Sequence, residues 1–290
     1  MRTRIALVTC ARLPDLAPDE ALLVHALAER GIDGIAAVWD APGIGWKSFD
    51  AVVMRSAWDY HLKADAFLAW IGAIESAGIP LWNPAPLLRW NSNKRYLGDL
   101  GNRGVNVVPT RWADATTTIS LAGIMDKAGW RDVVVKPEIS ATAHRTFRLH
   151  RDAADAFEAQ FQSLRLAQPM MVQPTVREIL TEGEWSLCFF GGEFSHALRK
   201  RPAAGDFRVQ DEHGGSARLD EPPSRLVADA KRTLGLVQWP WAYARVDCCS
   251  VDERLLLMEL EMLEPTFYLN LAPEAAERFA AVIERLVRTG

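Results

Sequence analysis

The chain has few cysteines and no long apolar run. Its four cysteines, Cys10, Cys188, Cys248 and Cys249, include no C-x-x-C pair, and its six histidines are dispersed. This usage excludes a disulfide framework and the common zinc motifs and favours a reducing compartment. No stretch approaches the roughly 18 apolar residues of a membrane span, and the run at residues 5–8 is too short for a signal peptide. We therefore expect a cytoplasmic protein with no membrane partner.

Excess positive charge is also absent. The formal net charge is −4 and the pI is about 5.9, so the chain has no bulk attraction for polyanions and we expect no nucleic-acid partner. With 49% hydrophobic and 24% charged residues, it can bury a sizeable core. Only seven of the 33 basic residues are lysines, so a lysine in an unusual place is informative.

Several common signatures are missing as well. No G-x-G-x-x-G follows the first apolar run, which sets aside a nicotinamide oxidoreductase, and no G-x-x-x-x-G-K-[ST] loop is present. There is no G-x-S-x-G elbow, the commonest serine hydrolase signal. The chemistry must be carried by other patterns.

The first third of the chain alternates between strand and helix patterns. Apolar runs predict strands, and apolar residues at helical spacing predict helices, in the order strand 5–9, helix 21–27, strand 35–39, strand 49–54, helix 64–76 and strand 78–82. This alternation predicts an α/β region with a mainly parallel sheet, whose ligands bind at the carboxyl ends of the strands. Arg55, Ser56, Asp59 and Tyr60 directly follow the third strand and are candidate substrate contacts.

The character of the chain changes near residue 90. A polar helical stretch is expected at 90–97, then a β-rich segment with its peak at 133–137, a helix at 152–162 and a strand at 170–174. Strands are expected from 184 to 264 and a final amphipathic helix at 274–288. We expect an α/β (α+β) protein with three regions, residues 1–90, 91–175 and 176–290.

A lysine ends the three-valine strand of the second region. A buried ammonium is costly unless an anion meets it, so Lys136 is a candidate phosphate ligand. The small-residue loop that follows contains Ser140, Thr142 and Thr146, whose amides and hydroxyls could close over phosphate oxygens. A strand-end lysine that extends to solvent remains the alternative.

Two glutamates lie two residues apart in an otherwise apolar run. On a strand, Glu259 and Glu261 share a face, which Leu255 and Leu257 are expected to extend. Asp247, on the preceding strand, would complete an all-oxygen magnesium site. An exposed edge strand with scattered acids is the alternative.

Two further segments carry weaker signals. Gln173 and Val176 lie where a strand passes into a connector that could meet an adenine edge, and Glu184 could accept hydrogen bonds from ribose hydroxyls. The basic segment 196–210 reads either as a solvated hairpin or as an anion site in which Arg208 binds a phosphate or carboxylate.

Taken in order, these features resemble the ATP-grasp superfamily. The features are Lys94, the strand-end Lys136-Pro137, the small-residue loop, the Gln173-x-x-Val176 hinge and the Asp247…Glu259-x-Glu261 set. Within this superfamily, the chain resembles the branch of glutathione synthetase and ribosomal-protein glutamate ligase. In that branch the last metal ligand is commonly Asn, whereas this chain has Glu261. The motifs MRSAWDY (54–60), WNSNK (90–94) and ELEMLEP (259–265) resemble the O-ureido-D-serine cyclo-ligase family within it. The resemblance implies an N-terminal Rossmann-like subdomain, a small central lid and a C-terminal α+β subdomain.

The resemblance also implies roles. The nucleotide, ATP, would lie between the central and C-terminal regions, contacted by Lys94, Lys136, Ser140, Thr142, Gln173, Val176 and Glu184. Asp247, Glu259 and Glu261 would hold Mg²⁺, as two ions. Lys136 and Arg208 would act on the transferred phosphoryl group. Arg55 would bind a substrate carboxylate, Ser56, Asp59 or Tyr60 the amino and ureido groups, and Glu264 the ammonium of a small amino acid.

The implied reaction activates the substrate carboxylate as an acyl phosphate and closes the cycloserine ring, with ADP released. His144 and His196 are conceivable bases, or ordinary surface histidines. A homodimer is a family-level expectation. The alternatives are an ADP-forming carboxylate–amine ligase, which product mass would separate, and a nucleotide-binding protein without activity.

Overall fold

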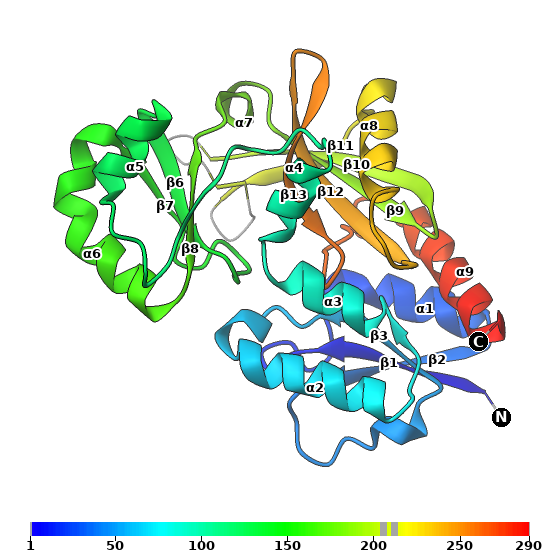
Figure 1. The fold of residues 1–290 in the computed structure, drawn as a ribbon. Helices are drawn as coiled ribbons and strands as arrows, with labels where there is room; N and C mark the ends of the chain where they lie inside the picture. The colour runs from blue at the N-terminus through cyan, green and yellow to red at the C-terminus, as the bar shows by residue number, and fades with distance from the viewer. Residues whose placement is uncertain (1, 204–207, 210–213, 290) are drawn as a thin grey trace.

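The computed structural model describes residues 2–203, 208–209 and 214–289. Within these residues the strands form three sheets, one for each successive part of the chain (Figure 1).

The N-terminal sheet is parallel, with the order β2-β1-β3-β4. Its strands and the helices around them are β1 (Thr3–Thr9), α1 (Ala21–Glu29), β2 (Ile32–Val38), β3 (Ala51–Ser56), α2 (Ala64–Ser76), β4 (Leu81–Trp82) and α3 (Ala85–Ser92). The next helix, α4 (Tyr96–Asn102), packs instead into the apolar cluster of the C-terminal sheet. Every residue of β3 is buried, as expected for a parallel strand covered on both faces. The predicted α/β region is therefore present.

The middle sheet is antiparallel and has the order β5-β8-β6-β7. Its elements are β5 (Arg111–Ala113), α5 (Leu121–Ala128), β6 (Asp132–Pro137), β7 (Phe147–His150), α6 (Ala154–Ala167) and β8 (Met170–Pro174). Both helices pack on this sheet through a separate apolar cluster. Helix α5, capped by the Ser120 side chain and closed by Gly129 at φ 70°, was not anticipated from the sequence.

The C-terminal sheet has the order β11-β10-β9-β12-β13. Its elements are α7 (Arg177–Thr181), β9 (Glu184–Phe190), β10 (Glu193–Arg201), β11 (Ser216–Leu219), α8 (Ser224–Leu234), β12 (Tyr243–Val251), β13 (Arg254–Glu261) and α9 (Glu274–Thr289). Helix α8 interrupts the region that was expected to contain only strands.

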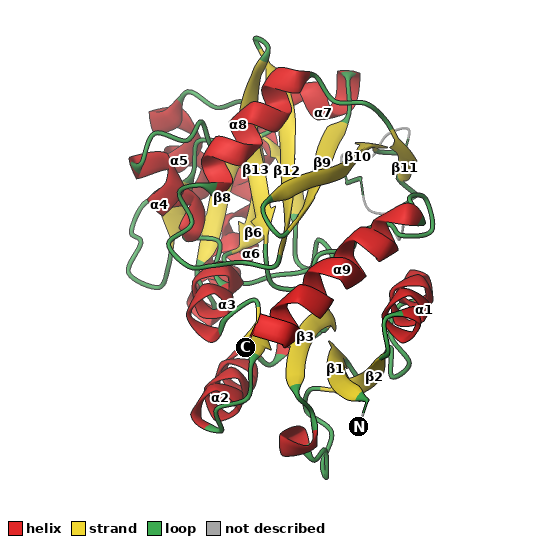
Figure 2. Ribbon diagram, turned by 90° about the vertical axis from the view of Figure 1, so that its right-hand side faces the viewer, coloured by secondary structure: helices red, strands yellow, loops and turns green. Residues whose placement is uncertain are grey.

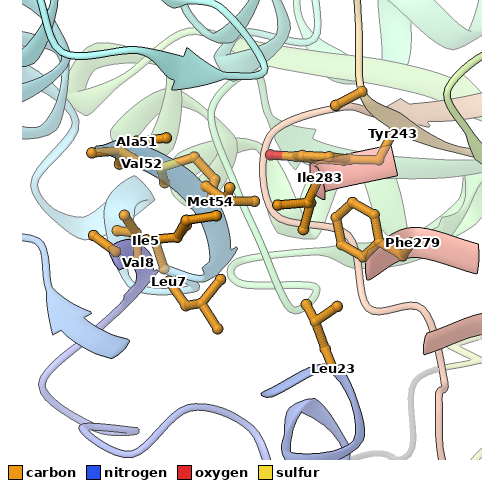
Figure 3. Close-up of a cluster of buried hydrophobic side chains, with 14 of the residues drawn as sticks. Ile5, Leu7, Val8, Leu23, Ala51, Val52, Met54, Tyr243, Phe279 and Ile283 are labelled. Carbon is orange, nitrogen blue, oxygen red and sulfur yellow. The ribbon is translucent and has the colours of Figure 1, made fainter. Parts of the chain in front are cut away.

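The last helix joins the C-terminal sheet to the N-terminal region. Helix α9 packs against α1 on one side and against β9 and β10 on the other (Figure 2). Phe279 and Ile283 of α9 and Tyr243 of β12 lie in the same cluster as Leu7 and Met54 of the N-terminal sheet (Figure 3). The N- and C-terminal regions thus share one hydrophobic core.

The helix expected at 90–97 is broken. Helix α3 ends at Ser92 and α4 begins at Tyr96. Asn93 is extended, and its side-chain oxygen accepts a hydrogen bond from the Arg95 amide at 2.9 Å. This local turn competes with helix continuation and leaves Lys94 between the two helices.

Of the two expected region boundaries, one falls inside a helix and the other at the end of a strand. Position 90 lies inside α3, and position 175 directly follows β8. No helix in the described part of the chain is both long and apolar enough to span a bilayer.

Candidate active site

A cavity of about 460 Å³ opens where the three sheets meet. Its walls come from the loops after β1 and β3, from β6 and β8 of the middle sheet, and from β12, β13 and the segment that follows β13. Lys94, Lys136, Ser140, Thr142, Gln173, Val176, Glu184, Arg208, Asp247, Glu259, Glu261, Tyr60 and Glu264 all line it. Residues more than 200 positions apart in sequence, such as Tyr60 and Glu264, are thus gathered around one space.

Strand alternation places Lys136 in the cavity. Val133 and Val135 enter the core of the middle sheet, whereas Val134 and Lys136 line the cavity. Among the described residues, no carboxylate oxygen lies within 4.0 Å of the Lys136 ammonium. Burial lowers its pKa, partly offset by the charge of Glu259. This ammonium is placed to meet an anionic ligand.

Lys94 reaches the same space from the break between α3 and α4. Its ammonium donates to the Ser140 carbonyl at 2.7 Å and lies 3.0 Å from a Glu259 carboxylate oxygen. Its backbone amide donates to the Glu138 carbonyl at 2.9 Å. Lys94 therefore ties the loop after β6 to the acidic strand β13.

The acidic residues of β12 and β13 face the cavity because of a β-bulge. Asp247 pairs with Glu259, but Cys248 pairs with Leu257, so Met258 is an extra residue on β13. A bulge of this kind reverses the alternation of side chains along the strand.

The bulge changes which apolar residues of β13 lie on the same face as Glu259 and Glu261. Leu255 and Leu257 belong to the core behind the sheet. Leu256 and Met258 instead join the apolar cluster beside the cavity. The prediction that Leu255 and Leu257 share the face of the two glutamates is therefore wrong. β13 is an edge strand, yet its acids point into the cavity.

The three expected metal ligands are held by cations. Arg245 donates to Asp247 at 2.9 Å and to Glu261 at 2.7 Å, and Lys200 lies 3.5 Å from Asp247. Ser186 also donates to Asp247. Burial favours the neutral acid, but Arg245 and then Lys200 outweigh it and lower the pKa of Asp247 to about 2. Burial, partly offset by Arg245, raises the pKa of Glu261 to about 7.

Lys200 is one of the cavity residues that sequence reasoning missed, with Asp19 and Arg245. It is buried, lies 2.5 Å from Glu184 and lines the cavity. Arg199 instead packs over Trp185 and pairs with Asp220. The basic segment was read as a whole, although strand periodicity separates Lys200 from Arg199 and places it on the same face as buried Leu198. That spacing was the available signal.

An apolar wall forms the opposite side of the cavity. Val108, Val176, Ile179 and Met258 belong to one cluster and line the space. Gln173 lies beside them and donates to the Thr110 hydroxyl at 3.0 Å. A flat aromatic ring fits such a wall, with polar groups at its edge.

The loop after β6 closes one side. Ser140 is buried and its hydroxyl donates to the Pro137 carbonyl at 3.3 Å. Thr142, Ala143 and Arg145 all have positive φ, between 51° and 54°. Such conformations are costly for residues other than glycine, so the loop holds a defined shape.

Arg208 also lines the cavity. Its predicted companions at 205–207 and 210–213 lie outside the described residues.

Arg55 does not line the cavity, and its expected contact with a substrate carboxylate stays a prediction. Its guanidinium is fully buried and paired with Glu20. It also donates to the Pro265 carbonyl at 3.2 Å and stands 4.7 Å from the centre of the Phe267 ring. All of β3 is buried, so its last side chains find partners within the protein.

Ser56 and Asp59 are likewise engaged elsewhere. The Ser56 hydroxyl accepts from the Ala17 amide at 3.2 Å, and Asp59 accepts from the Trp39 indole at 2.8 Å. Neither lines the cavity, and their expected substrate contacts stay predictions. Tyr60 does line it, and burial together with the charge of Glu264 raises the pKa of its hydroxyl.

The two histidines considered as bases have other surroundings. The His144 ring packs against His61, with centroids 5.1 Å apart, and does not line the cavity. His196 is buried, with its Nε2 2.9 Å from the Phe267 carbonyl. Burial lowers the pKa of both.

The acid set fits a divalent cation by its chemistry. Asp247 and Glu259 are cross-strand neighbours, Glu261 follows on the same side, and all three offer the oxygen ligands that Mg²⁺ prefers. Burial raises the pKa of Glu261 to about 7, and the charges of Glu259 and Asp247 act in the same direction. Within the described residues no three such side chains are gathered tightly enough to hold a metal, and Lys94 and Arg245 form ion pairs with Glu259 and Glu261.

Comparison with known proteins gives consistent relatives. The model of "D-cycloserine synthetase DcsG, N-terminal domain" matches residues 5–83. The cycloserine biosynthesis protein DcsG of Streptomyces lavendulae is 32% identical over 297 residues, which covers 97% of this chain and 98% of that protein.

Solved structures agree. The crystal structure of D-cycloserine synthetase DcsG matches with a TM-score of 0.87 at 29% identity, covering 98% of this chain and 99% of that one. D-alanine–D-alanine ligase from Bacillus anthracis matches with a TM-score of 0.72 at 14% identity, covering 100% and 98%, which shows a shared fold.

Fold and cavity together define the chain as an ADP-forming ligase of the ATP-grasp class. Ligases of this class use ATP and Mg²⁺. Within the class, the chain belongs to the DcsG family, that of D-cycloserine synthetase.

Proposed function

We propose that the protein converts O-ureido-D-serine into D-cycloserine, with ATP consumed and ADP, phosphate, CO₂ and ammonia released. The observation that carries this proposal is a single cavity in which cationic and acidic residues meet beside an apolar wall, in a chain 32% identical to a cycloserine biosynthesis protein. The proposal has three parts: nucleotide binding, phosphoryl transfer and ring closure.

ATP would occupy the side of the cavity between the middle and C-terminal sheets. The apolar wall at Val176 would receive the adenine and Gln173 its polar edge, while Glu184 would accept from the ribose hydroxyls. Lys136 would meet the phosphates, because its ammonium has no carboxylate partner among the described residues. Lys94 would join it by exchanging its contact with Glu259 for a phosphate oxygen.

The loop after β6 would cover the phosphates. Ser140 and Thr142 line the cavity beside Lys94, and their backbone amides and hydroxyls suit phosphate oxygens. Closure of such a loop excludes water, which protects a reactive acyl phosphate from hydrolysis.

Asp247, Glu259 and Glu261 would hold two magnesium ions. When bound, the metal supplies charge neutralisation at the β- and γ-phosphates, so that a substrate carboxylate can approach the γ-phosphorus. Arg245, which already bridges two of these acids, fixes their orientation. Arg208 would stabilise the transferred phosphoryl group.

In the first chemical step the substrate carboxylate oxygen attacks the γ-phosphorus and ADP leaves. The ureido nitrogen bonded to oxygen then attacks the acyl phosphate carbonyl, the new C–N bond closes a five-membered ring, and phosphate leaves. Because both groups belong to one bound molecule, folding it in the cavity gives a high effective molarity. Hydrolysis of the carbamoyl group completes the reaction. Tyr60 and Glu264 would contact the substrate, and Glu264 would bind the ammonium group of the substrate.

The test is the mass of the product formed from ATP, Mg²⁺ and O-ureido-D-serine as the sole amino acid, with the L-enantiomer as control. A product with the mass of cycloserine supports the proposal. If ADP appears only when a separate amine is added and the product is an amide, the protein is an intermolecular carboxylate–amine ligase and the cyclisation is wrong.

A further inference from the structure

Two acids that line the cavity form no ion pair with a described residue, although the charge of Arg55 acts on Asp19 and that of Lys94 acts on Glu264. Glu184, Asp247, Glu259 and Glu261 each lie within 4.0 Å of a lysine or arginine nitrogen. Asp19 and Glu264 also line the cavity, but neither has an ion pair with any described residue. Burial raises the pKa of both acids, and a cationic group of the ligand would favour their ionised forms, so such a group is a suitable partner.

Both acids belong to the wall between the N-terminal region and the segment after β13. Asp19 lies in the short 3-10 helix Pro18–Glu20, and its Oδ2 accepts from the Leu269 amide at 3.1 Å. Glu264 is 8% exposed, and its own carbonyl accepts from the Trp58 indole at 3.1 Å. The lysines and arginines of the described residues that line the cavity lie on other segments of the chain.

The segment that carries Glu264 is held by side chains along its whole length. Each carbonyl from 262 to 267 accepts a hydrogen bond from a different side chain. In order, the donors are Asn83, Tyr243, Trp58, Arg55, Arg245 and His196. The donor–acceptor distance is 3.2 Å for Arg55 and between 2.7 and 3.1 Å for the other five. A segment without regular secondary structure is thus fixed in one conformation.

Arg55 joins the two acidic segments. It pairs with Glu20, the neighbour of Asp19, and donates to the carbonyl of Pro265, the neighbour of Glu264. Its planar guanidinium presents these donors in a rigid arrangement, and it is fully buried.

We propose that Arg55 is a positioning residue for amino-acid binding, and that it fixes the spacing of Asp19 and Glu264, which together receive the ammonium of the substrate. This inference rests on the proposed function, because it concerns the same cavity and names the group by which the amino acid is recognised. It requires a free ammonium, so an N-acylated amino acid is excluded.

The main test uses steady-state ADP release with two readouts, the KM for the amino acid and the KM for ATP. The variant R55M/E20Q removes the buried charges of both partners, so that neither is left alone in the core. The KM for the amino acid is expected to rise by roughly tenfold or more, the loss of about 1.4 kcal/mol of binding, with the KM for ATP within about twofold of wild type.

The matched control is R30M. Arg30 also links the N-terminal region to another part of the chain, through Glu277 and Glu284 of α9, but it is away from the cavity. It is expected to lower the melting temperature and leave both KM values unchanged. Asp19→Asn and Glu264→Gln should each raise the KM for the amino acid, and Asp19→Asn should add less in the R55M/E20Q background, because coupled residues are not additive.

A second measurement needs no variant. Wild-type protein is compared by thermal shift with O-ureido-D-serine and with its N-acetyl derivative, in the presence of ADP and Mg²⁺. Stabilisation only by the free amine supports the inference, and equal stabilisation by both overturns the acid pair. A folded R55M/E20Q with an unchanged KM for the amino acid overturns the role of Arg55. Absence of any wild-type turnover contradicts the proposed function instead, and the thermal-shift comparison still decides the inference.

Discussion

Lys200 balances the charge of two acids of the cavity. Its ammonium is buried between Glu184 and Asp247, at 2.5 and 3.5 Å. Burial alone would lower its pKa, but the charges of Asp247 and Glu184 raise it well above its ordinary value. Removing one partner from such a group leaves an uncompensated buried charge, which is far costlier than losing a surface pair.

We therefore predict that Lys200→Met lowers the free energy of unfolding by about 3–5 kcal/mol and weakens ATP binding, because Glu184 loses its orientation toward the ribose. Denaturant unfolding and an ATP titration measure the two effects. Lys231→Met is the control, since Lys231 is exposed and pairs with Glu193 on the surface. Equal effects of the two substitutions would contradict the assignment of Lys200 to the site.

A second prediction concerns the Glu261 side chain. It stands where related ligases commonly have Asn, and burial raises its pKa to about 7. Glu261→Asn removes one negative charge from the proposed metal site, so the Mg²⁺ concentration for half-maximal activity should rise by about tenfold, since carboxylate count sets affinity for hard cations. Glu193→Gln, a change at an exposed acid, should leave the Mg²⁺ requirement as it is. An unchanged requirement in Glu261→Asn would remove Glu261 from the metal site.

The loop between β6 and β7 contacts the N-terminal region through a pair of histidines. His144 of this loop packs on His61, which belongs to the 3-10 helix Tyr60–Leu62. Burial, then the charges of His144 and Lys94, lowers the pKa of His61 to about 4, while Asp59 opposes this. Arg145 also lowers the pKa of His144, after burial. The contact between loop and N-terminal region thus requires a neutral His61.

The lowered pKa of His61 makes the folding stability depend on pH. Between pH 6.5 and 4 the unfolded chain binds a proton at His61 that the folded chain does not, so stability falls as pH falls through this window. The loss should be on the order of 1 kcal/mol at this half-buried site. His61→Gln should reduce the slope of unfolding free energy against pH between 6.5 and 4.5, measured by denaturant titration. His25→Gln, at an exposed histidine of α1, should leave it unchanged, and equal slopes in His61→Gln and wild type would contradict the account.

At the same scale, sequence periodicity predicted elements better than it predicted faces. Helix α2 was expected at 64–76 and is found there. In β13, however, the bulge at Met258 exchanged the leucines of the two faces, and an apolar run such as 255–258 carries no signal for a bulge. The break at Asn93 likewise depends on one side-chain hydrogen bond, although Asn is a residue in which such turns are common.

The whole molecule shows why part of the site escaped prediction. Cavity residues were found where chemistry was concentrated in a short segment, as for Lys136 and for Glu259 and Glu261. The environment of Arg55 depends on Glu20 and Pro265, its partners 35 and 210 positions away. Such long-range packing is invisible to local patterns, and the same holds for Asp19.

The shared core of the N- and C-terminal regions gives a prediction for the whole chain. Phe279 of α9 stacks on Phe190 at 4.7 Å and lies within the cluster that includes Leu7. Phe279→Ala should lower stability by about 3–5 kcal/mol and shift tryptophan fluorescence and far-ultraviolet dichroism transitions together. Phe161→Ala, in the separate core of the middle sheet, is the comparison. Transitions that separate in Phe279→Ala, with one part unaffected, would contradict a shared core.

The central claim is that one bound amino acid supplies both the activated carboxylate and the attacking nitrogen. The most direct measurement is the simultaneous quantification of ADP and cycloserine formed by the protein from ATP, Mg²⁺ and O-ureido-D-serine, with Lys136→Met as the inactive reference. The account predicts one cycloserine for each ADP, with no second amine present. ADP release without cycloserine, or cycloserine formed equally well by Lys136→Met, would contradict it.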